Sequence, residues 1–315
     1  MENLLFSIQV VAPLVLLMLA GYAGAHFNFL SSAFLSEANK FVFKVSLPFM
    51  LFRNVAMAVG TGEVNTKLIL TCLISIAIMI TLCCLFVPIF VKRNGQRGSM
   101  IQAIYRSNFL IYGIPLGLSL YGEEAMLPIS MAMAVSIPFY NVAAILILSY
   151  FSENRTNKML SWQSVLEVLK NPLIIGCAVG ALFGFLKITL PAWADMPVKS
   201  VGDVAIPLAL IVMGGQFKFR SLHKNIKMVI SASAARLVLI PLAAMLVFIH
   251  LGFRDAELCA LFCLFATPTA VVSHIMSENM GCDGELSAQI VVLTTVLSAF
   301  TIFGFVFWLK TGGML

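Results

Sequence analysis

The sequence predicts an all-helical membrane protein whose chain crosses the bilayer ten times. Of its 315 residues, 60% are hydrophobic and only 11% are charged, whereas a soluble domain carries about 25% charged residues. The apolar residues come in long unbroken runs, and a helix needs about 20 such residues to cross a bilayer. A transmembrane β-barrel would instead alternate apolar and polar residues in segments of about ten. These observations exclude a water-soluble globular protein, a disordered chain and a β-barrel.

Polar and charged clusters divide the chain into runs of bilayer length, joined by short loops. Glu2 precedes the first run without any Lys or Arg, so we expect this run to remain as a membrane span rather than to be cleaved as a signal peptide. The expected spans lie near residues 5–25, 34–58, 67–91, 101–121, 125–151, 164–186, 196–217, 224–250, 255–279 and 284–310.

Basic residues predict the orientation of the spans, because cytoplasmic loops carry an excess of Lys and Arg. Nine of the 20 basic residues fall in the loops between spans 3 and 4, 5 and 6, and 7 and 8: Lys92, Arg93, Arg97, Arg155, Lys158, Lys218, Arg220, Lys224 and Lys227. This places both termini outside the cytoplasm, in a multi-pass protein of the cell membrane. The acidic loop between spans 9 and 10 fits this orientation poorly. The net charge of +6 then reflects topology, and we expect no nucleic-acid partner.

Prolines and glycines recur at a fixed distance in the two halves of the chain. Pro13 and Pro172 are 159 residues apart, and so are Gly21 and Gly180. Eight of the 12 prolines pair in this way if a six-residue shift is allowed. Because each half holds five spans, the second half must insert upside down, as in many secondary transporters. We expect one repeat over residues 1–155 and an inverted one over 156–315. The alternative is that prolines are simply common in membrane helices.

Spans 4 and 9 have helix-breaking residues near their centres. Span 4 contains Gly113 and Pro115, and span 9 contains the run Thr267, Pro268, Thr269. Proline removes a helix hydrogen bond, and in lipid the freed groups must find partners or line a cavity. Matched interrupted spans indicate the binding site of a transporter, where half-helix N-termini suit an anion. The alternative is a pair of simple proline kinks.

Four polar residues inside the spans are further site candidates. Arg236 lies mid-span 8, where an ionisable residue indicates function and a guanidinium can bind a carboxylate. The alternative is a structural role, through an ion pair or hydrogen bonds to freed carbonyls. His274 is a candidate for proton coupling because of its ordinary pKa of about 6.5, and its alternative is packing. Asn108 and Tyr112 lie one turn apart and share a helix face.

The sequence gives no sign of a cofactor or metal. None of the seven cysteines forms a CxxC pair, and the four histidines show no HExxH spacing, which disfavours an intramembrane enzyme. No carboxylate lies at either break, so a sodium site made of acidic side chains is not evident.

Several segments together resemble one family. Span 4 reads NFLIYGIPL, and span 9 with its tail reads ATPTAVVSHIMSENMGCDGELSA. These runs, with VVAPLVLLMLAGY, NKFVFKVSLPFMLF, KNPLIIG and AARLVLIPL, resemble the corresponding segments of the auxin efflux carrier family in the same order. That family includes plant auxin exporters and bacterial permeases for small carboxylates such as malonate.

The resemblance implies a particular arrangement of the ten helices. Spans 1, 2, 6 and 7 would form a scaffold that also dimerises, and spans 3–5 and 8–10 a moving transport domain. Spans 4 and 9 would cross at Pro115 and Pro268, with the substrate beside the crossing. Asn108 matches an amide that contacts substrate in plant members. Plant members read NPNT at the start of span 6, whereas this chain reads Asn171, Pro172, Leu173; the missing second amide disfavours auxin.

The sequence therefore predicts a secondary transporter, or permease, of small organic anions such as carboxylates, working by elevator-type alternating access. The expected partners are the substrate, the lipid bilayer and a second copy of the chain. Alternatives are a sodium- or proton-coupled symporter of another organic solute, and a channel. A channel is disfavoured because it needs a ring of identical groups around a symmetry axis.

Overall fold

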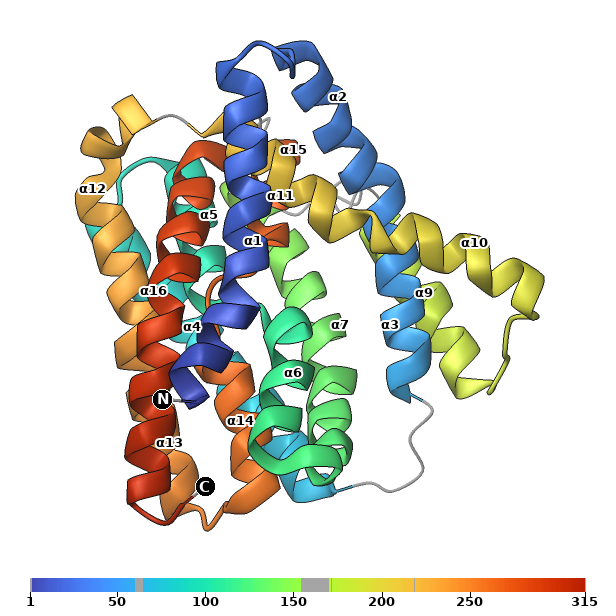
Figure 1. Cartoon of the computed structure of the whole chain (residues 1–315), viewed down its shortest axis with the longest axis vertical. Helices are drawn as coiled ribbons and strands as arrows, with labels where there is room; N and C mark the ends of the chain where they lie inside the picture. The colour runs from blue at the N-terminus through green and yellow to red at the C-terminus, as the bar shows by residue number, and fades with distance from the viewer. Residues whose placement is uncertain (1, 60–64, 154–169, 171, 218, 315) are drawn as a thin grey trace.

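The computed structural model describes residues 2–59, 65–153, 170, 172–217 and 219–314, in which the backbone is almost wholly helical (Figure 1). The α-helices are α1 (Glu2–His26), α2 (Ser32–Phe41), α3 (Leu47–Val59), α4 (Thr66–Phe90), α5 (Asn94–Tyr105), α6 (Phe109–Tyr121), α7 (Met126–Phe151), α9 (Pro172–Phe185), α10 (Ala192–Asp203), α11 (Ala205–Gln216), α12 (Phe219–Ala234), α13 (Ile240–His250), α14 (Asp255–Ala266), α15 (Val272–Asn279) and α16 (Gly284–Thr311). Three short helical turns complete them: η1 (Val42–Ser46), η2 (Gly122–Ala125) and η3 (Ala235–Leu239). In these ranges the only strand-like pairing is one isolated bridge, so the all-helical prediction is confirmed.

Five helical stretches are long and apolar enough to cross a membrane: Thr66–Phe90, Ile111–Phe151, Ala192–Gln216, Asn225–His250 and Gly284–Thr311. The stretches Ala12–His26 and Pro172–Phe185 are apolar but shorter. The membrane-protein class is thereby confirmed. Predicted spans 3, 5 and 10 agree with α4, α7 and α16 to within one residue at each end. Predicted span 1 lies within α1, and predicted span 6 falls partly outside the described residues. The other five predicted spans are each divided between two or three helices, and the number of ten stays a prediction.

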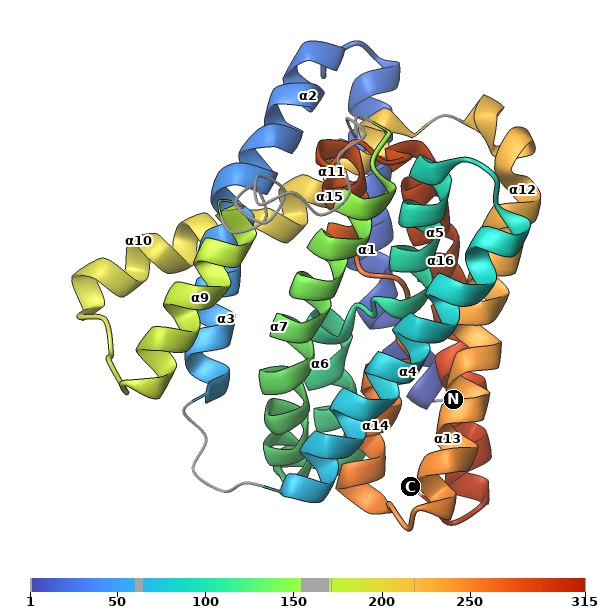
Figure 2. The ribbon, with the colours of Figure 1, turned by 180° about the vertical axis from the view of Figure 1, so that it is seen from behind.

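The loops gather at two opposite ends of the molecule. At one end, the Asp283 amide donates to the Gly95 carbonyl over 3.1 Å. This bond joins the connection between α15 and α16 to the first turn of α5. At the other end, the Lys67 amine donates to the Leu251 carbonyl over 3.0 Å. Figures 1 and 2 place the α4–α5 and α11–α12 connections together at the first end and the C-terminus at the second. Which end faces the cytoplasm stays a prediction.

Part of the orientation argument falls on undescribed positions. Arg155, Lys158 and Lys218 lie outside the described residues, and so do the side chains of Arg220 and Lys224.

Two helix pairs pack backbone to backbone through glycines. An added Cβ on Gly21 of α1 would lie 2.0 Å from the carbonyl oxygen of Ile211 in α11. One on Gly180 of α9 would lie 2.4 Å from the carbonyl oxygen of Phe52 in α3. Small residues allow such close approach, which drives helix association in lipid by packing. The two pairs are related by the same separation, because 180 − 21 and 211 − 52 both equal 159.

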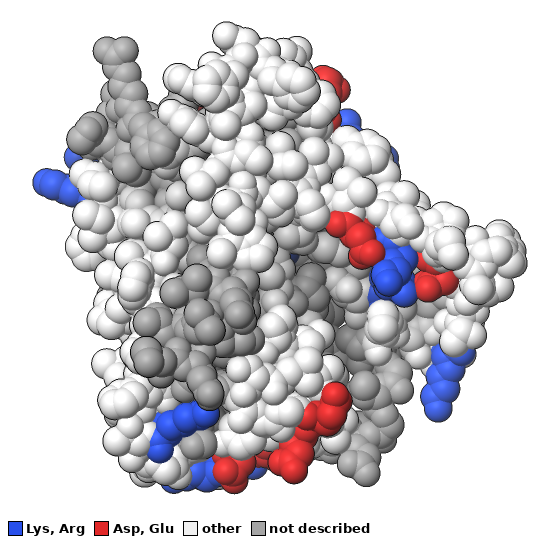
Figure 3. Space-filling model, viewed as in Figure 1, with Lys and Arg blue, Asp and Glu red and all other residues white. Residues whose placement is uncertain are grey.

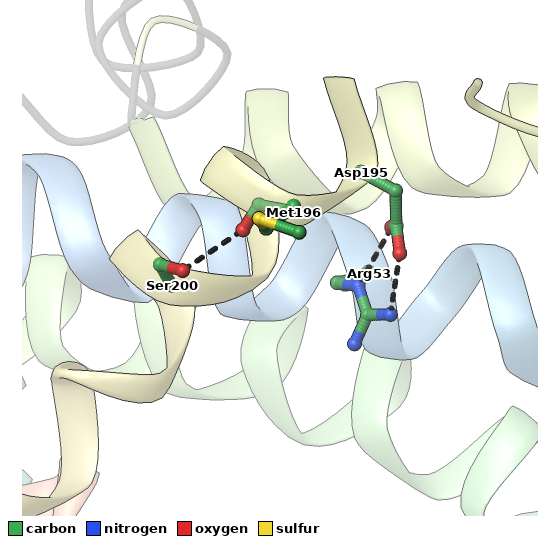
Figure 4. A network of polar contacts seen from close by, with 4 residues as sticks. All are labelled: Arg53, Asp195, Met196 and Ser200. Atoms are coloured by element: carbon green, nitrogen blue, oxygen red, sulfur yellow. Dashed lines mark hydrogen bonds and ion pairs between the residues drawn. The ribbon is translucent and has the colours of Figure 1, made fainter. Parts of the chain in front are cut away.

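An ion pair adds α10 to these helices. The Arg53 guanidinium on α3 donates to both oxygens of Asp195 on α10, over 2.9 Å each (Figure 4). This two-point geometry is favourable, but both side chains are partly exposed, so the contribution is modest. We call α1–α3 and α9–α11 the glycine-packed region, and α4–α7 with α12–α16 the broken-helix region.

The outward side chains suit contact with lipid. Along α4, Ile74, Ile78, Leu82 and Leu85 recur at helical spacing and are 46–62% exposed. Such a stripe on a soluble protein would be an aggregation hazard. Much of the face in Figure 3 likewise carries no charged side chain. The surface therefore agrees with the membrane-protein class.

Candidate functional site

Two helix interruptions meet at the centre of the broken-helix region. The first separates α5 from α6 at residues 106–108, and the second separates α14 from α15 at residues 267–271. The backbone amide of Asn108 donates to the Pro268 carbonyl over 2.8 Å, and the backbone amide of Ala270 donates to the Arg106 carbonyl over 3.0 Å. This antiparallel bridge satisfies backbone groups that an interrupted helix leaves free, as burial in an apolar medium demands.

The predicted position of the first break was wrong. Helix α6 runs without interruption from Phe109 to Tyr121, through both Gly113 and Pro115. Gly113 packs instead against the ring of Phe109, to which an added Cβ would approach within 2.7 Å. Pro115 lies inside α6 and takes no part in the bridge. The bridge joins Ser107 to Thr269. Sequence reasoning gave weight to the proline, but the helix ends where backbone partners exist in the second break.

Arg236 holds the ends of the two helices that precede the breaks. Its side chain is fully buried in η3. Its Nε and Nη2 donate to the Thr267 carbonyl over 2.9 and 2.7 Å, and Nη2 also lies 3.4 Å from the Leu264 carbonyl. Nη1 donates to the carbonyls of Ile104 and Tyr105 over 3.3 and 3.4 Å. A guanidinium has five N–H groups, so every one has an acceptor. These contacts favour the structural alternative, hydrogen bonding to freed carbonyls at helix C-termini, where a cation is also favoured.

The threonines of the second break also serve the backbone. The Thr269 hydroxyl donates to the Ala103 carbonyl over 2.7 Å, and its amide donates to the Thr294 hydroxyl of α16 over 3.3 Å. The Thr267 hydroxyl is buried and lacks a protein partner. Thr269 thus stabilises the bridge, while Thr267 keeps a free hydroxyl beside it.

Asn108 and Tyr112 lie at the start of α6 and are both buried. The Asn108 side chain does not cap the helix, and its Nδ2 has no hydrogen-bond partner. The Tyr112 hydroxyl lies 3.5 Å from the Ser298 hydroxyl of α16. Asn108, like Thr267, is therefore a candidate with unused hydrogen-bonding capacity among the described residues.

Arg106 is a polar residue of the first break that sequence reasoning missed. It is buried, its Nη2 donates to the Asn141 side-chain oxygen of α7, and its Nη1 lies 2.9 Å from the Met276 sulfur. No ion pair involving Arg106 occurs among the described residues. The signal was present, because a lone arginine inside the apolar run 101–121 indicates function by the same rule that singled out Arg236.

His274 joins the two regions of the molecule. Its Nδ1 lies 3.0 Å from the Gly284 carbonyl, and its Nε2 lies 3.2 Å from the side-chain oxygen of Gln216, the last residue of α11. Both ring nitrogens therefore have partners, and the ring does not touch the bridge residues through a hydrogen bond.

Two further expectations concern residue 171 and metals. Asn171 lies outside the described residues, so its place relative to the breaks is untested. Within the described part of the chain, no group of three or more His, Cys, Asp or Glu side chains is arranged to hold a metal ion.

Comparison with known proteins adds independent information. Residues 6–306 match the model of a family described as "Membrane transport protein". The chain is 22% identical to an uncharacterized transporter of Methanocaldococcus jannaschii, over 95% of this chain and 97% of the relative. It is 22% identical to an uncharacterized transporter of Methanothermobacter thermautotrophicus, over 93% and 95%. It is also 21% identical to a Rhizobium meliloti protein named "Putative malonate transporter", over 96% of each chain.

Proposed function

The chain belongs to the family of membrane transport proteins that includes the auxin efflux carriers, as its motifs predict, and we propose that it is a secondary transporter of small carboxylates. It is a multi-pass membrane protein, and a transporter implies a small-molecule substrate. The proposal adds the chemical class of that substrate and the mechanism of its movement.

The paired breaks are the observation that carries this proposal. Interrupted helices in corresponding positions of two halves mark the substrate site of many secondary transporters. Here α5 and α14 are both 12 residues long and begin 161 positions apart, and their breaks are bonded to each other. Asn108 lies at that junction, and its side-chain amide has no partner among the described residues. It is the substrate contact that we propose first.

The glycine contacts support an inverted repeat with its halves at 1–155 and 156–315. Exchanging the halves turns the contact of Gly21 with Ile211 into that of Gly180 with Phe52, since each residue moves by 159 positions. In the proposed mechanism the glycine-packed region is the scaffold, which also forms the homodimer. The broken-helix region is the transport domain.

Among the described residues, few side-chain hydrogen bonds would have to break for the transport domain to slide. The Asn279 amide of α15 donates to the Asn39 oxygen of α2 over 2.8 Å, and His274 meets Gln216 over 3.2 Å. Elevator motion would exchange these contacts for others, because a moving domain needs alternative partners in each state. His274 stays our candidate for proton coupling because it lies at this boundary.

A carboxylate substrate agrees with two observations. The name of the Rhizobium meliloti relative refers to malonate. In this chain Leu173 occupies the position where the plant motif has its second asparagine, and its side chain is buried. A site with one amide fewer suits a smaller substrate than auxin.

The direct test is uptake of labelled malonate by proteoliposomes containing the purified chain. We expect saturable uptake, and accumulation of label when unlabelled malonate is trapped inside, because a carrier exchanges substrate while a channel does not. Proton and sodium gradients, applied separately, identify any coupling ion. Uptake that equals that of protein-free liposomes for a panel of carboxylates would overturn the proposal, and linear uptake without exchange would favour a channel.

Elevator motion has its own test. In a background without the seven native cysteines, N39C with N279C would be joined by a short bifunctional thiol reagent. We expect uptake to stop, because the bridge ties α15 to α2. The matched control joins R53C to D195C inside the glycine-packed region, which should leave uptake unchanged. Equal uptake by both bridged proteins would exclude the proposed division.

A further inference from the structure

The two buried arginines near the breaks differ in how their charge is satisfied. Arg236 is fully buried and directs its N–H groups at four carbonyls. Arg106 has two partners, the Asn141 oxygen and the Met276 sulfur. A thioether is a weak acceptor, so among the described residues three of the five N–H groups of Arg106 lack an acceptor and one has a poor one.

The charge of Arg106 is also uncompensated. In the described part of the chain no Asp or Glu oxygen lies within ion-pair distance of its guanidinium. An isolated cation removed from water is costly unless an anion or a full set of hydrogen bonds offsets that cost. Arg106 is 5% exposed and Arg236 has no exposed surface, so bulk water does little to offset the charge of either arginine.

Unpartnered donors surround Arg106 in sequence and space. Among the described residues, the Tyr105 hydroxyl and the side-chain amide of Asn108 are buried without a hydrogen-bond partner. The hydroxyls of Ser107 and Tyr140, the neighbour of Asn141 in sequence, are buried and face each other, which leaves one of their two O–H groups free to donate. The rings of Tyr105 and Tyr140 are 5.8 Å apart. Buried polar groups in folded proteins are almost always bonded, so a set of free donors at one place indicates a ligand rich in oxygen acceptors.

The Arg106 site also contacts the other region of the molecule. Asn141, which accepts from Arg106, lies 3.8 Å through its Nδ2 from the sulfur of Cys177. Cys177 belongs to α9 of the glycine-packed region, and Arg106 belongs to the first break of the other region. The Arg106 environment therefore lies at the boundary of the two proposed domains.

We propose that the guanidinium of Arg106 binds a carboxylate of the transported anion, with Ser107, Asn108 and Tyr140 as neutral donors to the same ligand. This assignment rests on the proposed function and deepens it. Guanidinium and carboxylate match in a two-point geometry, and a guanidinium without an ion-pair partner in the described part of the chain requires one ionised carboxylate. A second carboxylate of malonate would be held by the neutral donors.

Thermal unfolding of the purified full chain, with and without malonate, tests the assignment. Malonamide, which has the same skeleton without charge, is the matched probe. The wild-type protein should be stabilised by malonate and not by malonamide. R106Q should lose at least tenfold in malonate affinity. The control R53Q removes an arginine that has its own carboxylate partner in the scaffold, and it should keep the wild-type response.

A second variant decides the matter even if R106Q does not fold. N141D replaces the amide oxygen that Arg106 already contacts with a carboxylate of the same shape, which supplies the missing anion from within. N141D loses the hydrogen bond from Asn141 Nδ2 to the Ile137 carbonyl but gains an ion pair with Arg106, so we expect it to unfold near the wild-type temperature without ligand. It should lose malonate binding and uptake at least tenfold. A ligand response of either variant within twofold of the wild type would overturn the role of Arg106 while leaving the proposed function intact. A wild-type protein that responds to no carboxylate would overturn both.

Discussion

The glycine-packed region and the broken-helix region solve the problem of packing in a membrane differently. In the first, helices approach through Gly21 and Gly180 until backbone nearly touches backbone. Of the buried polar side chains in the described residues, all but Asn39 and Ser46 lie in the second region. Buried polar groups are costly unless bonded, so their concentration beside two helix breaks indicates where function is located. The glycine contacts have no such cost and suit a rigid support.

R236Q is expected to destabilise the broken-helix region more than any other variant in this set. Removing the guanidinium deprives four buried carbonyls of their donors and removes a cation from two helix C-termini. Each unsatisfied buried group costs about 1–3 kcal/mol, so we expect a loss of at least about 3 kcal/mol in unfolding free energy. Thermal unfolding in detergent measures it. A variant that folds normally but no longer binds malonate would instead give Arg236 the substrate role.

A smaller loss is expected from crowding the glycine-packed region. G21A places a methyl group 2.0 Å from the Ile211 carbonyl oxygen, so α1 and α11 must separate. Overpacking costs about 1–3 kcal/mol, measured again by thermal unfolding. G304A is the matched control, because an added Cβ there has no neighbour within 4 Å and alanine favours helix. Equal melting temperatures of the two variants would contradict the close approach.

N108A sharpens the comparison by affecting function without the fold. The side-chain amide of Asn108 has no partner to lose among the described residues, and alanine keeps the backbone bond to Pro268, so thermal stability without ligand should stay close to that of the wild type. Binding of malonate should weaken about fivefold, since a neutral hydrogen bond contributes about 1 kcal/mol. Titration of the malonate-induced shift in melting temperature checks this. Unchanged affinity would remove Asn108 from the site.

The smallest effect is expected at the boundary between the regions. Protonation of His274 lets both ring nitrogens donate, to the Gly284 carbonyl and the Gln216 oxygen that they face, which would strengthen the tie between α15 and α11. H274Q should therefore reduce stimulation of uptake by an inward proton gradient about twofold, with uptake at equal pH retained. A gradient response identical to that of the wild type would leave His274 as a packing residue.

Much of the fold could be predicted from the sequence because the signals are local. Hydropathy gave the boundaries of α4, α7 and α16 to within one residue, since the bilayer fixes helix length. The interruption of span 9 could be predicted from Pro268, whereas that of span 4 lies at residues 106–108 and not at Gly113 or Pro115, on which the prediction rested. Arg106 lies inside the predicted span 101–121 and could have been noticed there, but only the observed break shows that it is buried beside Asn141.

The sequence by itself determined the membrane environment, the family, and the spacing of 159 residues that relates Gly21 to Gly180. The tertiary structure decided which backbone groups satisfy one another: Asn108 with Pro268, Ala270 with Arg106, and Arg236 with the ends of α5 and α14. Hydropathy and short motifs are properties of consecutive residues, so the sequence alone reveals them. Hydrogen bonds between residues some 160 positions apart depend on how the helices pack. That packing gives Arg236 an acceptor for every N–H group and gives Arg106 acceptors for only part of them among the described residues.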